Sequence, residues 1–123
     1  MRYVGPRGAP GMPEILKVTA AIAGARLERE IAVIIDERCS GGSRGTLVGH
    51  VAPEAFDGGP NALVQGGDAV TIELERRELD LGVSQNDLIE REFRWSAPSF
   101  SEERALLARF RNNVAAATHG YIT

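Results

Sequence analysis

The stretch Ile31-Ala32-Val33-Ile34-Ile35, followed by Asp36 and a glycine-rich loop over residues 37–45, carries the strongest structural signal in the chain. The apolar run is mostly β-branched and too short for a stable helix, so it predicts a buried strand that is apolar on both faces. The loop holds three glycines, two serines and two arginines. Its backbone N–H groups could form a nest for a carboxylate or phosphate, although a solvated glycine turn is the plainer interpretation.

Turn residues and apolar periodicity predict the elements on either side of this stretch. Residues 5–11 contain three glycines and two prolines and predict an irregular loop. A helix is expected over residues 13–24, with a proline in its first turn and a glycine at its end. Residues 46–51 predict a second strand. A helical turn at 53–56 and a break in the chain at 57–60 should follow.

The second half of the chain predicts a hairpin and two helices. Residues 70–75 and 79–83 alternate apolar and charged side chains, which indicates two paired strands. Ser84 precedes Asp87 at the spacing of a helix cap, and a last helix should start at Ser101. We expect the leucines of these two helices to form core stripes. The apolar residues that the helices carry are Leu88, Ile89, Phe93, Leu106, Leu107, Phe110 and Val114.

Composition limits the range of functions. A chain of 123 residues, 43% of them hydrophobic, can bury a core as one domain over residues 1–123. The net charge of -3 and the scattered Lys and Arg residues argue against nucleic acid as a partner. No apolar run approaches the roughly 20 residues of a membrane span, so we expect no membrane contact. The single cysteine excludes an internal disulfide, and a cytoplasmic protein is expected.

Several residues have a plain structural interpretation beside a chemical one. His50 is expected to be a hydrogen-bonded core residue, and His119 to be solvated. Cys39 is expected to be a buried, inert thiol, although a neighbouring arginine could lower its pKa. Asp36 and Glu37 leave a strand in opposite directions, which argues against a shared metal ion. Solvated or salt-bridged carboxylates are expected there.

Three segments together closely resemble one known family. Residues 3–14, 35–45 and 49–55 match, in order and spacing, the C-terminal domain of the dihydroxy-acid and sugar-acid dehydratases, which include phosphogluconate dehydratase. The resemblance continues through residues 58–60 and 66–68 and covers nearly the whole chain. It implies an α+β fold: a β-barrel-like swivelling β/β/α domain with flanking helices, similar to the C-terminal domain of aconitase-type dehydratases.

The resemblance also implies a reaction. The family removes water from a 2,3-dihydroxy or sugar acid and yields a 2-oxo acid. A base takes the C2 proton, an iron–sulfur cluster assists the departing 3-hydroxyl, and magnesium steadies the substrate. The position of Ser40 matches the proposed base, acting as an alkoxide, and Ser43 assists it. We expect Arg38, Gly41 and Gly42 to bind the small carboxylic acid, because N–H dipoles and cations stabilise such oxyanions.

The chain departs from the family at positions that matter for this chemistry. Val4 stands where the family has a glutamate that binds magnesium, and valine has no lone pair for a hard cation. We therefore expect no metal ligand and no cofactor in this chain. Glu37 stands where the family has glycine, and adds negative charge beside the expected alkoxide. The family's N-terminal cluster domain is not part of this sequence.

These departures leave two main hypotheses and one weaker one. The chain could belong to a dehydratase whose N-terminal domain is a separate polypeptide or has been cut away, and would then be inactive alone. It could instead be a stand-alone, non-catalytic module that binds small acids or mediates assembly. An anion-binding regulatory domain is supported by the glycine loop only. In each case an uncovered docking surface predicts a homo-oligomer or a partner.

Overall fold

The computed structural model describes residues 1–11, 14–99 and 105–123. The order of elements is α1 (Leu16–Gly24), β1 (Ala32–Ile34), β2 (Thr46–Val48), η1 (Ala55–Asp57), α2 (Pro60–Leu63), β3 (Val70–Glu73), β4 (Glu78–Leu81), α3 (Gln85–Arg94), α4 (Ala105–Asn113) and η2 (Ala117–His119). This mixture of helices and short strands confirms the expected α+β class. None of the helices in these ranges has the length and apolar character needed to cross a bilayer.

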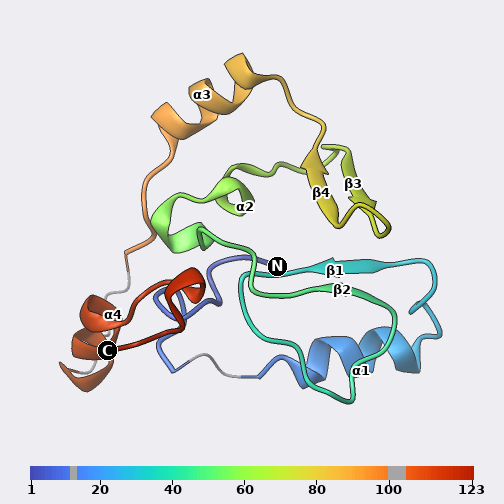
Figure 1. The fold of residues 1–123 in the computed structure, drawn as a ribbon, viewed down its shortest axis with the longest axis horizontal. Helices are drawn as coiled ribbons and strands as arrows, with labels where there is room; N and C mark the ends of the chain where they lie inside the picture. Colours follow the sequence, from blue (N-terminus) through green and yellow to red (C-terminus); the bar gives the residue numbers. More distant parts are fainter. Residues whose placement is uncertain (12–13, 100–104) are drawn as a thin grey trace.

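The described strands form two separate pairs. β1 and β2 are parallel, with Val33 opposite Leu47, whereas β3 and β4 form the expected antiparallel hairpin. In Figure 1, α1 lies on one side of the β1–β2 pair, the hairpin, α2 and α3 lie on the other, and α4 lies at one end. Parallel neighbours require a crossover connection that returns to the starting edge. Residues 35–45 are that crossover, which explains why the glycine-rich loop is long and irregular.

The predicted boundaries are close to the observed ones, with some differences. α1 starts at Leu16, and Pro13 lies outside the described residues. The predicted start of the last helix at Ser101 also lies outside them. The turn at Gly58 is confirmed by its left-handed φ of 77°. The predicted break does not extend through Pro60, because this residue begins α2, where a missing N–H costs nothing.

The predicted burial of β1 on both faces is wrong. Val33 is buried, but Ile31 at the strand's entrance is 40% exposed and Ala32 is exposed too. β1 has one hydrogen-bonded neighbour among the described strands, β2, and part of its surface borders an open cleft. The apolar run therefore predicted the strand correctly, but it did not predict which parts of the strand are buried.

The predicted core stripes of the two late helices are also largely wrong. Ile89 is 55% exposed and Phe93 is 91% exposed, and α3 has no buried residue. Leu106 and Leu107 are exposed, while Leu88 and Phe110 are half-buried and Val114 is buried. The stripes exist in the sequence, but among the described residues nothing packs against most of them.

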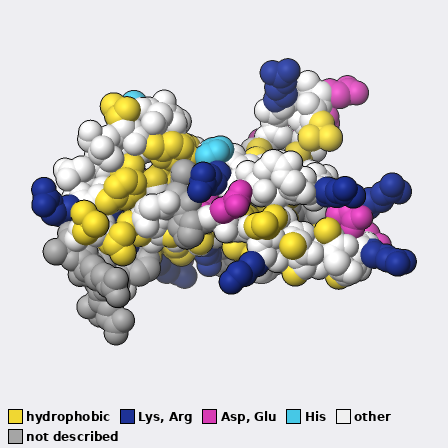
Figure 2. Space-filling view, turned by 90° about the horizontal axis from the view of Figure 1, so that it is seen from below, with side chains coloured by type: hydrophobic (Ala, Val, Ile, Leu, Met, Phe, Trp, Pro, Cys, Tyr) yellow, Lys and Arg dark blue, Asp and Glu magenta, His cyan; other side chains and the backbone are white. Residues whose placement is uncertain are grey.

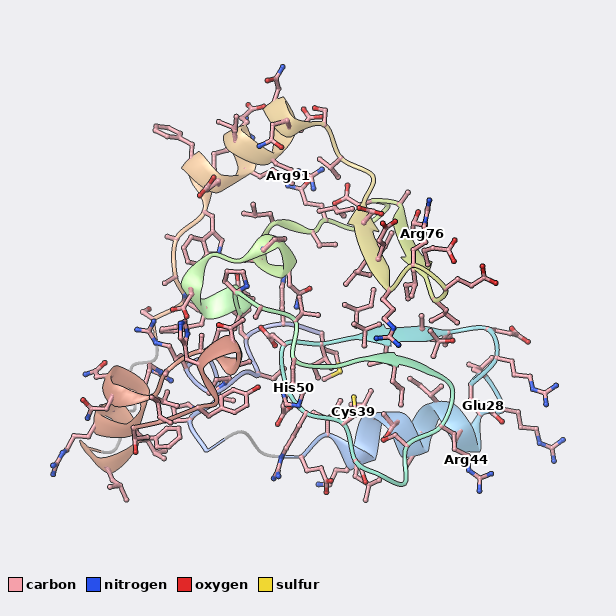
Figure 3. The ribbon with its side chains drawn as sticks, in the orientation of Figure 1. Glu28, Cys39, Arg44, His50, Arg76 and Arg91 are labelled. Carbon is pink, nitrogen blue, oxygen red and sulfur yellow. The ribbon has the colours of Figure 1, made fainter. Side chains whose placement is uncertain are left out.

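Polar contacts attach α3 to the rest of the chain instead. The Ser84 cap is confirmed, since its Oγ accepts a hydrogen bond from the Asp87 amide at 3.2 Å. Arg91 donates to both carboxylate oxygens of Asp68 and to the carbonyl of Leu63. Figure 3 shows this arginine reaching from α3 toward the segment between α2 and β3. The Arg91 contact holds the pKa of the Asp68 carboxyl at about 2, well below its usual value.

The centre of the fold combines a small apolar core with buried charge. Val33, Ile35, Ala55, Ala62 and Val114 are its buried apolar residues. Asp36 lies among them at 1% exposure. Its carboxylate accepts hydrogen bonds from the backbone amides of Tyr3, Val4 and Ala55 at 3.1, 3.2 and 2.9 Å. One side chain therefore binds two segments, residues 3–4 and Ala55, that are distant from each other in the sequence.

We expect Asp36→Asn to lower the free energy of unfolding by about 2 kcal/mol or more, as measured by urea denaturation. Hydrogen bonds to a charged acceptor contribute about 1.5–3 kcal/mol, and an amide NH2 would face an N–H donor. The matched control is Asp80→Asn on the exposed face of β4, which should change stability by less than about 0.5 kcal/mol. Equal unfolding free energies for the two variants would contradict the role given to Asp36.

Candidate functional site

The N-terminal segment is held in place by a second buried carboxylate. Glu54 is 3% exposed and accepts hydrogen bonds from the amides of Arg7 at 2.9 Å and Gly8 at 3.0 Å. A Cβ at Gly5 would lie 2.5 Å from Glu54 Oε2, so only glycine allows this approach. Burial raises the pKa of the Glu54 carboxyl, and the two amide donors oppose that rise. Two carboxylates, Asp36 and Glu54, thus bind the backbone of residues 3–8.

Arginine and aromatic side chains connect this segment to α4. Arg111 is buried and its Nε donates a hydrogen bond to the carbonyl of Arg7. Its guanidinium lies 5.0 Å from the centre of the Phe56 ring, and that of Arg7 lies 5.8 Å from it. Arg7 also forms an ion pair with Asp57. These cation–π and ionic contacts fix residues 3–8 between η1 and α4.

The predicted catalytic serines lie together in the loop of residues 37–45. Ser40 Oγ accepts a hydrogen bond from the Gly42 amide at 3.2 Å, and the Ser43 amide donates to the Ser40 carbonyl at 3.0 Å. Ser43 Oγ donates to the hydroxyl of Thr19, a buried residue of α1, at 3.1 Å. Gly41 is exposed on the surface of the same loop. The loop therefore directs two of its own amides to Ser40 and attaches Ser43 to α1.

Arg38 and Arg44 flank this loop with exposed side chains. Figure 3 shows Arg44 at the far end of the loop from His50, on the side of α1. From these exposed positions, the two guanidinium groups can interact with an anion bound at the loop. Whether Ser40, Ser43, Arg38, Gly41 and Gly42 act on a substrate stays a prediction from the resemblance.

Glu37 is the unexpected member of the site. Its side chain is 0% exposed, and neither carboxylate oxygen has a hydrogen-bond partner. Burial raises the pKa of this carboxyl to about 7, and the charges of Asp36 and Glu14 add to the rise while Arg38 opposes it. The expectation of solvated or salt-bridged carboxylates at positions 36 and 37 is therefore wrong. Both are buried, and only Asp36 has donors.

Cys39 and His50 are connected to Glu37 through the backbone around Gly49: a Cβ at Gly49 would lie 3.6 Å from Cys39 Sγ, and the His50 amide donates to the Glu37 carbonyl at 2.9 Å. Cys39 is half-buried, not buried as expected. Partial burial, together with the charge of Glu37, raises the pKa of its thiol, so the alternative of a lowered pKa is wrong. His50 is exposed, not a core residue as predicted, because β2 ends at Val48 and His50 has a φ of 56°. Its Nδ1 forms a hydrogen bond with the hydroxyl of Tyr121. His119 is exposed, as expected.

Sequence reasoning missed the structural role of Asp36 and Glu54. The sequence contained only an indirect indication that these two carboxylates bind backbone amides. A segment rich in glycine and proline cannot satisfy its own backbone N–H groups in a helix or sheet, so buried amides there need side-chain acceptors. A carboxylate at the end of a buried strand and one preceding a helical turn are suitable acceptors. Their assignment to particular amides required the tertiary structure.

The cofactors implied by the resemblance can be tested against the residues present. An iron–sulfur cluster is held by several cysteine thiolates, and the chain has one cysteine with a raised thiol pKa. The cluster does not fit this chain. Within residues 1–11, 14–99 and 105–123, no group of three or more His, Cys, Asp or Glu side chains is placed to surround a metal ion. Val4 contributes only its amide, which bonds to Asp36.

An apolar cleft of about 590 Å³ separates the β1–β2 pair from the β3–β4 hairpin. The side chains that line it come from both pairs of strands and from the segment after α2. They include Ile34, Val48, Val64, Val70, Leu79 and Leu81. An isolated two-stranded parallel sheet is unusual, since parallel sheets are normally covered on both faces. The strands of this chain therefore leave apolar surface uncovered.

Comparisons with known proteins identify the class to which this fold belongs. A family model described as dihydroxy-acid/6-phosphogluconate dehydratase C-terminal matches residues 1–121. The chain belongs to this dehydratase family and corresponds to its C-terminal region. It is 50% identical to a dihydroxy-acid dehydratase of Saccharolobus islandicus (strain L.S.2.15 / Lassen #1) over 123 residues, all of this chain and 22% of that protein.

Other relatives match this chain with a similar identity and over a similar share of their own length. A protein named dihydroxy-acid dehydratase 2 from Pseudoalteromonas translucida is 46% identical, and the match covers 22% of its length. A mitochondrial dihydroxy-acid dehydratase of Aspergillus terreus is 45% identical, with 21% of its length covered. The chain thus spans about one fifth of the length of the curated relatives it matches.

The raised pKa of Glu54 predicts a particular pH dependence of stability. A carboxyl whose pKa rises above its ordinary value of 4.5 on folding contributes stability at low pH, and this is lost as pH rises through the folded value. Wild type should therefore lose stability relative to Glu54→Gln as pH increases from 4.5 upward. Denaturant unfolding at a series of pH values measures the difference. The control Glu75→Gln replaces an exposed residue, so its stability relative to wild type should not change with pH. A wild type that gains stability relative to Glu54→Gln as the pH rises would refute the assignment.

Proposed function

We propose that this chain supplies the serine-bearing domain of a dehydratase that converts a 2,3-dihydroxy or sugar acid to a 2-oxo acid. The observation that carries the proposal is the family match over residues 1–121, within which the loop with Ser40 starts from the carboxyl end of β1 in the parallel β1–β2 pair. Ligands of sheets with parallel strands typically bind at that end of the strands. The relatives' names support the substrate class.

The proposed step for this chain is removal of a proton. Ser40, as the alkoxide, takes the proton from C2 of the substrate, and the electron pair of that bond forms the C2–C3 double bond. The 3-hydroxyl leaves with its bonding pair and, with one proton, becomes water, so the enol that remains tautomerises to the 2-oxo acid. The Gly42 amide, which donates to Ser40 Oγ, stabilises the alkoxide. Arg38, Gly41 and Gly42 bind the substrate carboxylate, and Ser43 steadies the loop through Thr19.

The reaction requires polypeptide beyond the matched region. The cluster of the family does not fit this chain, and the match covers only 22% of the length of the Saccharolobus islandicus relative. We propose that a dehydratase N-terminal domain, on the same or a separate polypeptide, completes the site, and that the chain alone is inactive. Strands from that region would cover the apolar cleft and convert the two pairs of strands into the barrel-like swivelling domain of the family.

Exposed apolar residues support a further assembly. Phe93, Ile89 and Leu106 are exposed on α3 and α4, and Figure 2 shows apolar side chains at the surface of the molecule between charged ones. A surface of this kind normally acquires a partner, so we propose a homo-oligomer where the N-terminal domain is not supplied. Cytoplasmic location stays a prediction from the sequence.

A second candidate function is favoured by one observation. Val4 supplies no ligand to magnesium, and an unpartnered Glu37 carboxylate lies three residues before Ser40. A chain that had lost elimination chemistry could keep the loop as a site for small carboxylic acids or as an assembly module. An assay of 2-oxo acid formation separates this function from the first, because a binding or assembly module does not convert a substrate.

We expect no 2-oxo acid from the purified chain with dihydroxy acids, even after iron–sulfur reconstitution and addition of magnesium. Mixed with the remaining four-fifths of a related dehydratase, the chain should restore turnover, measured as 2-oxo acid formation. Ser40→Ala should reduce that turnover by at least about 100-fold, because a positioned base contributes about 10²–10⁴ in rate. The control Ser96→Ala, at an exposed residue, should have no effect.

Each outcome of this assay is decisive. Turnover by the chain alone would reject its dependence on a second region. Full activity in Ser40→Ala would reject the serine as the base. A folded mixture without activity would reject the dehydratase function in favour of the binding module.

The loop's part in anion binding can be measured separately. Titration of a sugar acid and of phosphate, followed by calorimetry, should show at least about tenfold weaker binding for Arg38→Ala, because a charge-assisted hydrogen bond contributes about 1.5–3 kcal/mol. The control Arg29→Ala removes an exposed arginine from the connection between α1 and β1. Equal affinities for wild type and Arg38→Ala would exclude the loop from substrate binding.

A further inference from the structure

A second pocket, of about 230 Å³, lies between the end of α2 and the last turn of α3. Three arginines line it, Arg2 from the N-terminal segment and Arg91 and Arg94 from α3. Figure 3 shows Arg91 on the side of α3 that faces α2. Among the described residues that line the pocket there is no aspartate or glutamate. Three cations therefore surround one small space in a chain whose net charge is -3.

The hydrogen bonds of these arginines leave donors for a ligand. Arg2 donates from Nη1 to the carbonyls of Ala62 and Val64 at 2.9 and 2.7 Å. A guanidinium carries five N–H groups, so these two bonds use fewer than half of the donors of Arg2. Arg2 can therefore bind a further acceptor without losing its present contacts.

The negative groups nearby do not cancel the positive charge of the pocket. Each carbonyl of residues 62–64, at the end of α2, already accepts a hydrogen bond from an arginine. The Asp68 carboxylate neutralises Arg91, but Arg2 forms no ion pair with the described residues. Arg94 is paired with Glu90, and a pair whose side chains are 71% and 59% exposed contributes little. The pocket therefore keeps a net positive charge at Arg2, and Arg94 can exchange its exposed partner for a bound anion.

The size of the pocket fits a small ligand. At about 30 Å³ for each water molecule it holds roughly seven waters, whereas pockets for drug-sized ligands measure roughly 300–1,000 Å³. Trp95 lines one side, and its indole N–H donates to the Tyr3 hydroxyl at 2.9 Å, which holds the ring in place. The donors that face a ligand are then guanidinium groups, whose planar pairs of N–H groups match the oxygens of phosphate.

We propose that this pocket binds a phosphate group, as the free ion or as the end of a small phosphate monoester. The phosphate accepts hydrogen bonds from Arg2 and Arg94 and so joins the N-terminal segment to α3. No residue of α3 is buried, so this bridge adds to the polar contacts that hold the helix. The residues of the pocket lie outside the loop of residues 37–45, and the proposal does not rest on the dehydratase function.

The single tryptophan of the chain reports on this pocket. Because Trp95 lines the pocket, its fluorescence should change saturably on titration with inorganic phosphate or glycerol phosphate at a constant ionic strength of about 0.15 M. Amide hydrogen exchange in α3 should slow in the same titration, since the phosphate joins the helix to Arg2. In Arg94→Gln the affinity should fall at least about tenfold, because one charge-assisted hydrogen bond is lost. Tighter binding of inorganic phosphate identifies the free ion as the ligand, and tighter binding of glycerol phosphate identifies a monoester.

The matched control is Arg76→Gln, which also removes an exposed, ion-paired arginine, at 68% exposure in the connection between β3 and β4. It should bind phosphate as wild type does. The proposal is overturned if neither probe changes the Trp95 fluorescence, or if Arg94→Gln binds as tightly as wild type. A Trp95 response that is lost in Arg38→Ala and kept in Arg94→Gln would assign the phosphate to the loop of residues 37–45 and also overturn it. No turnover enters this test, so a failed dehydratase assay leaves its result unchanged.

Discussion

The buried carboxylate of Asp36 is the interaction on which the rest of this structure depends. It accepts amide hydrogen bonds from Tyr3, Val4 and Ala55, which are separated by up to 52 positions of the chain. A glycine- and proline-rich segment has no secondary structure to satisfy its amides, so an acceptor must come from elsewhere. Glu54 provides a second acceptor for Arg7 and Gly8. The small apolar core forms around these two charges.

This arrangement explains why carboxylates, rather than apolar side chains, occupy the centre of the site. Asp36 and Glu54 are compensated by backbone donors, and Glu37 is not. Because the Glu37 carboxyl is buried without donors, its pKa is raised to about 7, which favours the protonated form. The loop with the half-buried Ser40 and Ser43 follows Glu37 directly along the chain.

Local patterns in the sequence predicted the elements better than their surroundings. The β-branched run before Asp36, the alternation in the hairpin and the Ser84 cap each correspond to an observed strand or helix end, since these signals act within a few residues. Burial was predicted less well. Phe93 and Ile89 form an apolar stripe on α3, yet both are exposed, because burial depends on partners that local periodicity does not specify. The apolar cleft between the two pairs of strands was not predicted for the same reason: local periodicity does not specify which partners cover an apolar surface.

The sequence by itself determined the family, the α+β class and the loop that brings Ser40 and Ser43 together, because motifs of closely spaced residues carry that information. Only the tertiary structure decided that Asp36 and Glu54 bind the backbone, that His50 is exposed and that Glu37 is buried without a partner. Those properties depend on contacts between residues up to 71 positions apart. Whether a carboxylate is solvated, paired or isolated is a property of its environment, and the chain creates that environment only when it folds.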